Sequence, residues 1–272
     1  MASFSAKEVA ELRKRTGAGI LDCREALQEC DGDLEKAEQW LREKGKISAG
    51  KRADRERAEG AVAVVVEGRV GAIAALECET DFVAKSAEFV QLVDELAAEL
   101  ASGGETALEA QRERVEKLAL TLKENIAIGQ TKRFEAPQGS VVGSYLHIQN
   151  GRGVNAVLVE LGGGAPELAH DIAVHVAFTR PEYLRREDVP AEVVETERQT
   201  VEAIARNEGK PEAALSKIIE GRLNGWFKER CLLEQPYVRD EKQTIAEMLR
   251  ANFARNRFLN GAECIANCIL VH

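Results

Sequence analysis

The sequence has few aromatic residues and lacks any apolar run as long as a membrane span. Aromatic side chains make up 5% of its 272 residues, whereas hydrophobic residues make up 44%. This ratio predicts aliphatic cores and many alanine-rich helices. The N-terminal stretch also lacks the apolar core of a signal peptide. We therefore expect a cytoplasmic protein that makes no contact with membranes.

Metal-site patterns are missing as well. No histidine stands at zinc-finger spacing from a cysteine, and the cysteines form no CxxC pair; they lie at positions 23, 30, 78, 231, 264 and 268. A structural zinc site needs four such ligands at characteristic spacings. We expect small buried thiols in a reducing compartment, with neither a metal nor a cofactor.

Catalytic signatures are also absent. The sequence contains no GxSxG, HExxH or Walker phosphate-loop motif, and its glycine-bearing stretches match no dinucleotide-binding fingerprint. No nucleophile with a partner base stands out around the four histidines. His170 and His175 fall on different sides of one amphipathic helix, where a structural role is favoured for each. The chain is therefore predicted not to be an enzyme.

Positive charge is in deficit. The formal net charge is -9 at pH 7, and the pI is about 5.2. An acidic protein repels phosphate backbones, so direct binding to RNA or DNA is not expected. What remains is a binding protein built from several parts.

Three short helices are predicted at the N-terminus. Ser5 and Glu8 form a capping box, and the stretch TGAG at 16–19 ends the first helix with two glycines. Apolar residues at helical spacing mark a second helix, and a third helix ends at Gly45. Residues 1–45 are thus predicted to form a small bundle of the ubiquitin-associated type.

The middle of the chain repeats one pattern. Two β-branched runs at 61–66 and 70–76 predict a hairpin, which an amphipathic helix follows. The same order recurs at 140–178, where Asn150-Gly151 is the strongest short signal for a hairpin turn. We interpret this recurrence as an internal duplication.

The predicted fold class is α+β, with the N-terminal helical bundle followed by a duplicated core of hairpins and helices. The stretch after the bundle is interpreted as a charged tether rather than a solvated helix. The last twenty residues give no clear assignment. The predicted parts are a linker at 46–59, core subdomain 1 at 60–139, the first part of core subdomain 2 at 140–189, an inserted helical hairpin at 190–230 and a C-terminal module at 231–272.

The stretch ECETDFVA at 77–84 stands where the first hairpin meets its helix. Asp81 can cap that helix while Phe82 packs beneath it as a hydrophobic staple. The two residues can instead present an acid and an aromatic wedge to another molecule. The second repeat has VELGGGAPE at this joint, so the pair is not needed to connect strand and helix. This difference weakens the cap-and-staple alternative, and the residues alone leave both open.

The sequence resembles the elongation factor Ts family. ELRKRTGAGILDCREAL at 11–27 is similar to the family's N-terminal signature, and ECETDFVAK at 77–85 is similar to its second signature. The likeness spans nearly the whole chain. Arg24 stands where a lysine is usual, and the tail after residue 250 only partly follows the family's closing strand. The further matches, in the family's order, are GSYLH, AVHVAFTRPEYL, KIIEGRLNGWFKERCLLEQPYV and KQTIAEML.

The resemblance implies a guanine nucleotide exchange factor without an active site of its own. Such a factor binds the GTPase elongation factor Tu in its GDP-bound and nucleotide-free states and lets GTP replace GDP. The alternative is a steric chaperone or binding module that holds a GTPase without promoting exchange. The contact residues that the resemblance implies are Thr80, Asp81, Phe82 and Val83 beside the Mg²⁺ and nucleotide site, Arg13, Ile20 and Leu21 on the GTP-binding domain, and His147 and His175 on another domain of the GTPase.

Overall fold

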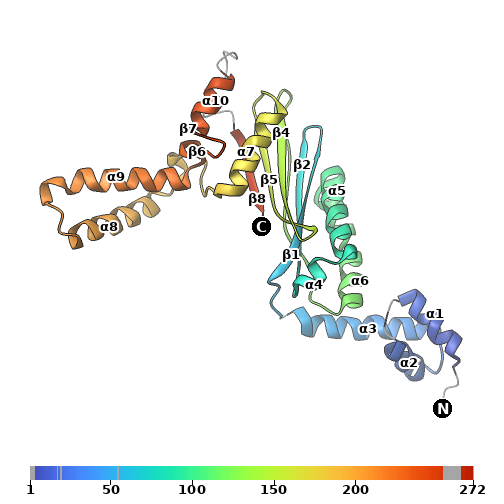
Figure 1. Cartoon of the computed structure of the whole chain (residues 1–272). Coiled ribbons are helices and arrows are strands. Elements are labelled where there is room, and N and C mark those ends of the chain that lie inside the picture. The colour runs from blue at the N-terminus through green and yellow to red at the C-terminus, as the bar shows by residue number, and fades with distance from the viewer. Residues whose placement is uncertain (1–3, 17, 19, 54, 254–264, 272) are drawn as a thin grey trace. The chain divides into compact units, whose positions relative to one another are not determined.

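The structure is a computed structural model that describes residues 4–16, 18, 20–53, 55–253 and 265–271. It contains 56% helix and 25% strand, which confirms the predicted mixture of helices and sheets (Figure 1). Among the described residues, no helix combines the length and the apolar character that a bilayer crossing requires. The chain divides into two compact units, one of Met1–Ala63, Ala74–Thr131 and Ile148–Val154 and one of Val64–Ile73, Lys132–His147 and Asn155–His272.

Three helices form the N-terminal part, α1 (Ala6–Thr16), α2 (Ile20–Glu29) and α3 (Leu34–Ala53). The predicted capping box starts α1, because the Ser5 amide donates to Glu8 Oε2 at 2.6 Å and the Glu8 amide donates to Ser5 Oγ at 3.3 Å. The helices enclose a common apolar core. Its fully buried side chains are Leu12, Cys23, Ala26, Leu27 and Ala37.

The third helix is longer than predicted. Its expected end was Gly45, but α3 continues to Ala53, so residues 46–53 of the predicted tether are helical. The helix contains two glycines, Gly45 and Gly50; each costs only about 1 kcal/mol relative to alanine, and the lysine, alanine and arginine residues around them are good helix formers. The tether interpretation was therefore wrong for this stretch.

Two glycines of the TGAG turn, at positions 17 and 19, lie outside the described residues.

The first repeat consists of a hairpin, helices and a third strand. β1 (Glu59–Glu67) and β2 (Val70–Cys78) form the predicted hairpin, and Gly68 in its turn has a φ of 61°. β3 (Ala127–Glu135) completes a sheet of order β1-β2-β3. The sequence did not predict β3, because its side chains are exposed or half-buried throughout and show no clear apolar alternation.

Two helices follow the first hairpin, α5 (Ala87–Ala110) and α6 (Arg112–Leu122). The apolar positions that predicted the first of them are buried, including Phe89 and Leu96 at 0% exposure. Gly104 has a φ of 67° and kinks α5 at the predicted glycine break. The helical periodicity was thus a reliable guide to which face packs inward.

The second repeat opens with the second predicted hairpin, β4 (Val141–Gln149) and β5 (Arg152–Leu161). Its turn residues Asn150 and Gly151 have φ values of 54° and 80°. Both lie in the left-handed region that a type I′ hairpin turn requires, which is why Asn-Gly is favoured there. The local turn chemistry therefore fixed this hairpin.

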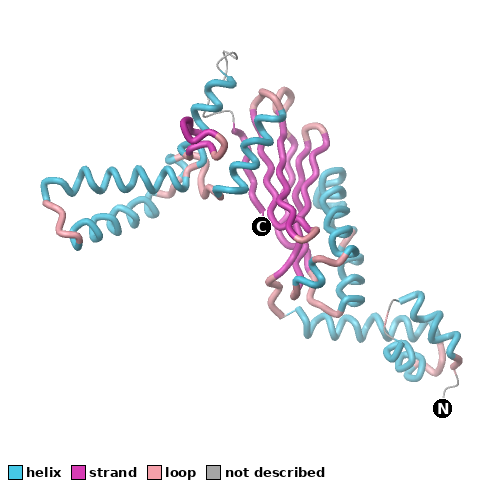
Figure 2. Tube along the Cα trace, viewed as in Figure 1, coloured by secondary structure: helices cyan, strands magenta, loops and turns pink. Residues whose placement is uncertain are grey.

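A helix and a third strand complete the second repeat. α7 (Pro166–Thr179) follows the hairpin, and β8 (Ile265–Val271) pairs antiparallel with β5 to give the order β4-β5-β8. Figure 2 shows the strands of both sheets in magenta. The third strand of this repeat comes from the last residues of the chain, which the sequence left unassigned. The insertion between α7 and β8 separates it from its hairpin.

Gly143 brings α7 close to β4. A Cβ atom at this position would lie 2.5 Å from the carbonyl carbon of Ala169 and 2.5 Å from the amide nitrogen of His170. Both are backbone atoms of α7, so they cannot give way unless the helix shifts. The glycine of the GSYLH stretch therefore sets the distance between strand and helix.

The insertion contains the predicted helical hairpin, α8 (Ala191–Asn207) and α9 (Glu212–Arg230) (Figure 1). Its two helices bury a small apolar core between them. The buried side chains are Val201, Ala205, Leu215, Ile219 and Leu223. The hairpin thus has more of a core of its own than the sequence indicated.

Short elements and one helix follow the hairpin. α10 has a capping box, because the Thr244 amide donates to Glu247 Oε2 at 2.8 Å and the Glu247 amide donates to Thr244 Oγ1 at 3.2 Å. Its buried residues share a core with those of α7. The elements after the hairpin are η2 (Leu232–Glu234), β6 (Pro236–Tyr237), β7 (Asp240–Thr244) and α10 (Ile245–Phe253), whereas η1 (Arg186–Asp188) precedes it.

Candidate functional site

A one-turn helix, α4 (Asp81–Ala84), lies between β2 and α5. Thr80 is its N-cap, and its hydroxyl accepts a hydrogen bond from the Val83 amide at 3.4 Å. Asp81 is therefore the first helical residue, and the expectation that it caps the following helix was wrong. Ser86 caps α5 instead, by accepting from the Phe89 amide at 3.4 Å. Two caps in close succession hold α4 as a separate turn.

Phe82 points into solvent from this turn, with 83% of its surface exposed. Ala84, on the same turn, is fully buried and forms the inward face of α4. The staple alternative requires a buried ring beneath the helix, so it was wrong. A phenylalanine this exposed leaves most of its apolar surface in water, where a partner can remove it.

Asp81 is charged and already has a partner, Lys85, which is the C-cap residue of α4. Its Oδ2 lies 2.5 Å from Lys85 Nζ. The hydrogen bond from Lys85 lowers the pKa of the Asp81 carboxyl below its ordinary value of 3.8. The carboxylate is therefore ionised at neutral pH. A cation that approaches Asp81 has to compete with the Lys85 ammonium.

The last residue of β2, Cys78, is buried and is hydrogen-bonded to Thr80, the N-cap of α4. The Cys78 thiol donates to the Thr80 carbonyl oxygen at 3.2 Å. Burial and the nearby Glu124 carboxylate raise the pKa of this thiol to about 12, so it stays protonated and can donate. Sequence reasoning missed Glu124, because it stands 44 positions beyond Thr80. The position of Glu124 after the end of a helix does not indicate, in the sequence, that its carboxylate contacts Thr80.

The described cysteines are free thiols; Cys23, Cys78 and Cys231 are buried, whereas Cys30 and Cys268 are half-buried. Cys264 lies outside the described residues. In the part of the chain that the structure describes, no three side chains of His, Cys, Asp or Glu come together in a way that could hold a metal ion.

The N-terminal candidates lie on the surface of α1 and α2. Leu21 is 79% exposed and Ile20 is 54% exposed, both in the first turn of α2. Arg13 is exposed near the end of α1. Two successive large apolar side chains are thus exposed to solvent at the start of α2.

His147 and His175 occupy opposite environments. His147 is exposed on β4, where its Nδ1 lies 3.3 Å from the Tyr145 hydroxyl. His175 is completely buried. Its Nδ1 accepts from the Val238 amide at 3.3 Å, so Nε2 carries the proton and donates to Gln235 Oε1 at 3.0 Å. A side chain without exposed surface cannot touch a partner, so a direct contact through His175 was wrong and its structural role holds.

Burial of His175 predicts that stability falls in mild acid. Desolvation lowers the pKa of His175 below its ordinary value of 6.5. Below that pH the unfolded chain takes up a proton while the folded chain stays neutral, so protonation favours unfolding. We expect the free energy of unfolding, measured with urea, to drop between about pH 7.5 and about pH 5.5. The drop should be smaller in His175→Asn.

The exposed histidine provides the control for this measurement. His147→Asn makes the same substitution at an exposed position and should keep the pH dependence of the wild type, because it leaves the buried His175 in place. A pH dependence that is the same in His175→Asn and the wild type would contradict the prediction.

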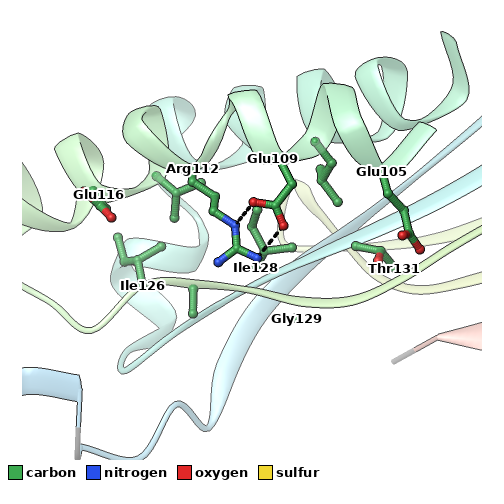
Figure 3. Close-up of a pocket in the computed structure, with 11 residues that line it drawn as sticks. Glu105, Glu109, Arg112, Glu116, Ile126, Ile128, Gly129 and Thr131 are labelled. Atoms are coloured by element: carbon green, nitrogen blue, oxygen red, sulfur yellow. Dashed lines mark hydrogen bonds and ion pairs between the residues drawn. The ribbon is translucent and has the colours of Figure 1, made fainter. Parts of the chain in front are cut away.

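A pocket of about 400 Å³ lies between the end of α5, α6 and β3 (Figure 3). Its apolar lining includes Leu108 and Val115, and Arg112 Nη2 at the start of α6 donates to Glu109 Oε1 at the end of α5 at 2.7 Å. The other two carboxylates, Glu105 and Glu116, are exposed. The lining residues include no histidine, cysteine or serine, and the hydroxyl group in the pocket is that of Thr131.

Comparison with known proteins gives consistent matches. The family model described as "Elongation factor TS" matches residues 79–261, and the model described as "Elongation factor Ts, mitochondrial, N-terminal" matches residues 1–49. Curated proteins named elongation factor Ts are similar over most of both chains. The protein of Renibacterium salmoninarum is 44% identical over 270 residues, which cover 94% of this chain and 96% of the relative. The protein of Clavibacter michiganensis is 46% identical over 264 residues, which cover 92% of this chain and 94% of the relative. The protein of Symbiobacterium thermophilum is 41% identical over 265 residues, which cover 92% of this chain and 86% of the relative.

Proposed function

Since the chain belongs to the elongation factor Ts family of translation elongation factors, we propose that it is a guanine nucleotide exchange factor for elongation factor Tu. It binds the GTPase with GDP in place, promotes the release of GDP and leaves the nucleotide-free GTPase to take up GTP. The observation that carries the proposal is the exposed Phe82 on a turn anchored at both ends.

Exchange requires a coupling between two binding events. If the factor weakens the binding of GDP, then GDP weakens the binding of the factor by the same ratio. The factor must therefore make contacts with the opened nucleotide site that it cannot make with the closed one. An aromatic side chain that occupies space needed by the closed site meets this requirement.

Phe82 is suited to be that side chain. Transfer of a phenylalanine from water into a pocket is worth roughly 1.5–3 kcal/mol, and each ~1.4 kcal/mol is tenfold in an equilibrium constant. The ring is 83% exposed in the free protein, so nearly all of this free energy is still available for a partner. Because α4 is held in place, little conformational entropy is lost when Phe82 binds.

Asp81 adds a negative charge at the same turn. A carboxylate near bound Mg²⁺ competes for its coordination or repels the nucleotide phosphates, and both effects favour release. Lys85 is the group that shields Asp81 in the free protein, at 2.5 Å. We propose that this ion pair opens when the turn meets the nucleotide site. Thr80 and Val83 then contribute to the shape of the turn.

The remaining affinity comes from docking at other surfaces. The exposed pair Ile20 and Leu21, with Arg13 nearby in the sequence, fits a contact with the GTP-binding domain, and His147 fits a contact with another domain. Exposed apolar side chains that lie side by side typically supply the centre of an interface. A net charge of -9 suits a partner with a basic contact face and speeds the encounter.

A chaperone that holds the GTPase without exchange is the second candidate. It needs only docking surfaces and does not require an aromatic ring and an acid presented on a rigid turn. The exposure of Phe82 therefore favours exchange over holding.

The release of a fluorescent GDP analogue from elongation factor Tu tests the proposal. With excess unlabelled GDP to prevent rebinding, saturating amounts of the protein should accelerate the loss of fluorescence. Removal of Mg²⁺ by a chelator gives a reference for release from a site without metal. A release rate that does not change at saturating protein would rule out exchange, and binding without acceleration would leave the holding function.

A further inference from the structure

Glu124 lies near the far end of the first repeat. From there its carboxylate binds residues 79 and 80, which lead into the turn that carries Phe82. Glu124 stands two positions beyond the end of α6, just after Lys123, whose φ of 61° reverses the chain there. Glu124 Oε2 accepts from the amides of Glu79 and Thr80, both at 3.1 Å. Its Oε1 accepts from the Thr80 hydroxyl at 2.5 Å. One carboxylate thus takes three hydrogen bonds from two successive residues.

The hydroxyl of Thr80 links this carboxylate to α4. An ionised carboxylate can only accept, so the hydroxyl proton of Thr80 points to Glu124. The lone pairs of the same oxygen are then free to accept from the Val83 amide, which lies at 3.4 Å. Glu124 therefore orients the N-cap of the helix on which Phe82 stands.

A second set of bonds runs in the opposite direction. The Asn125 amide donates to Glu79 Oε1 at 2.6 Å, and Asn125 Nδ2 donates to the Arg55 carbonyl oxygen at 2.8 Å. Arg55 Nη1 in turn lies 3.4 Å from Glu79 Oε2. The turn after β2 and the turn after α6 are thus joined by reciprocal hydrogen bonds.

α4 depends on such external bonds. It has four residues, far fewer than the ~12–15 at which an isolated helix becomes stable in water. Its only buried residue is Ala84, a small side chain. The direction of Phe82 must therefore be set by the groups that hold the two ends of the turn.

We infer that Glu124 is a positioning residue for nucleotide exchange, which fixes the direction in which the turn at Thr80–Val83 presents Phe82. The inference rests on the proposed function. Glu124 need not touch the GTPase to act in this way. Its loss should lower the rate of release more than the affinity for GDP-bound elongation factor Tu, because the docking surfaces on α2 are unaffected.

Glu124→Gln is the sharpest variant. The glutamine is nearly isosteric, and its oxygen still accepts from the backbone amides. Its NH₂ group, however, cannot accept the proton of Thr80, so the hydroxyl loses the orientation that serves Val83. Hydrogen bonds to charged groups are strong enough that we expect a loss of about tenfold in the maximal rate of stimulated GDP release. Glu116→Gln, an exposed glutamate on α6, is the matched control and should release GDP like the wild type.

Variants of Thr80 separate positioning from general damage. Thr80→Val removes the hydroxyl but keeps the shape of the side chain, and should lose about as much of the release rate as Glu124→Gln. The variant that combines Thr80→Val with Glu124→Gln should release GDP no more slowly than Thr80→Val alone, because both changes remove the same hydrogen bond. Losses that multiply in the double variant, or an equal loss of rate and affinity in Glu124→Gln, would overturn the inference.

Amide hydrogen exchange in the free protein tests the bonds without the GTPase. The Val83 amide should exchange faster in Glu124→Gln than in the wild type or in Glu116→Gln, because its acceptor, the Thr80 hydroxyl, loses its orientation. Unchanged exchange of the Val83 amide would overturn the inference even if the wild type releases GDP. If the wild type fails to release GDP, the proposed function falls, and amide exchange still decides whether Glu124 holds the turn.

Discussion

Replacing Phe82 with alanine is expected to slow the stimulated release of GDP about 10- to 100-fold. The ring stands in solvent in the free protein, so its burial free energy is gained only when the nucleotide site opens to receive it. The variant should bind GDP-bound elongation factor Tu almost as well as the wild type does, because that closed state offers the ring no pocket. Stopped-flow release at saturating protein measures the rate, and a titration of the GDP-bound GTPase measures the affinity.

Phe178 provides the matched control. It is 79% exposed, near the end of α7, and so resembles Phe82 in residue type and exposure. Phe178→Ala should leave the stimulated release unchanged. Neither substitution should alter the free energy of unfolding by more than about 0.5 kcal/mol, because neither ring is packed. If Phe82→Ala lowers rate and affinity equally, the ring is an ordinary docking contact and not a wedge.

Replacing Gly143 with alanine is expected to lower the free energy of unfolding by about 2–3 kcal/mol. The new Cβ would lie 2.5 Å from two backbone atoms of α7, closer than real side-chain atoms approach. The helix must then move away from β4, and the apolar core that it shares with α10 is loosened. Urea unfolding followed by circular dichroism measures the loss.

Gly221 is the control for this substitution. It lies in the interior of α9 with nothing near the position of an added Cβ. Gly221→Ala should therefore stabilise the protein, by up to about 1 kcal/mol, because alanine is the better helix former. If glycine-to-alanine lowers the free energy of unfolding at position 143 but raises it at position 221, contact with α7 is the cause of the loss at position 143. A Gly143→Ala protein as stable as the wild type would contradict the close approach of strand and helix.

Local elements could be predicted because their causes lie within a few residues. The capping box at Ser5 and Glu8 needs two side chains three positions apart. The hairpin at Asn150 and Gly151 needs two residues that tolerate positive φ. Each of these interactions forms in a short segment whatever the rest of the chain does.

The sequence identified the residues of the candidate site but not whether the side chain of Phe82 is exposed or buried. The motif at 77–85 marked Asp81 and Phe82, and the missing counterpart in the second repeat argued against a purely local role. Whether Phe82 is buried depends on which face of one helical turn meets the core. Ala84 meets it, and a turn of four residues carries too little periodicity to reveal this.

By itself, the sequence determined most of the helices, the two hairpins and the family to which the chain belongs. Only the tertiary structure decided where β3 and β8 pair, that His175 is sealed inside while Phe82 is not, and that Glu124 reaches Thr80. The physical reason is separation along the chain. These contacts join residues from tens to more than a hundred positions apart, and they form only after the chain has closed long loops around a common core.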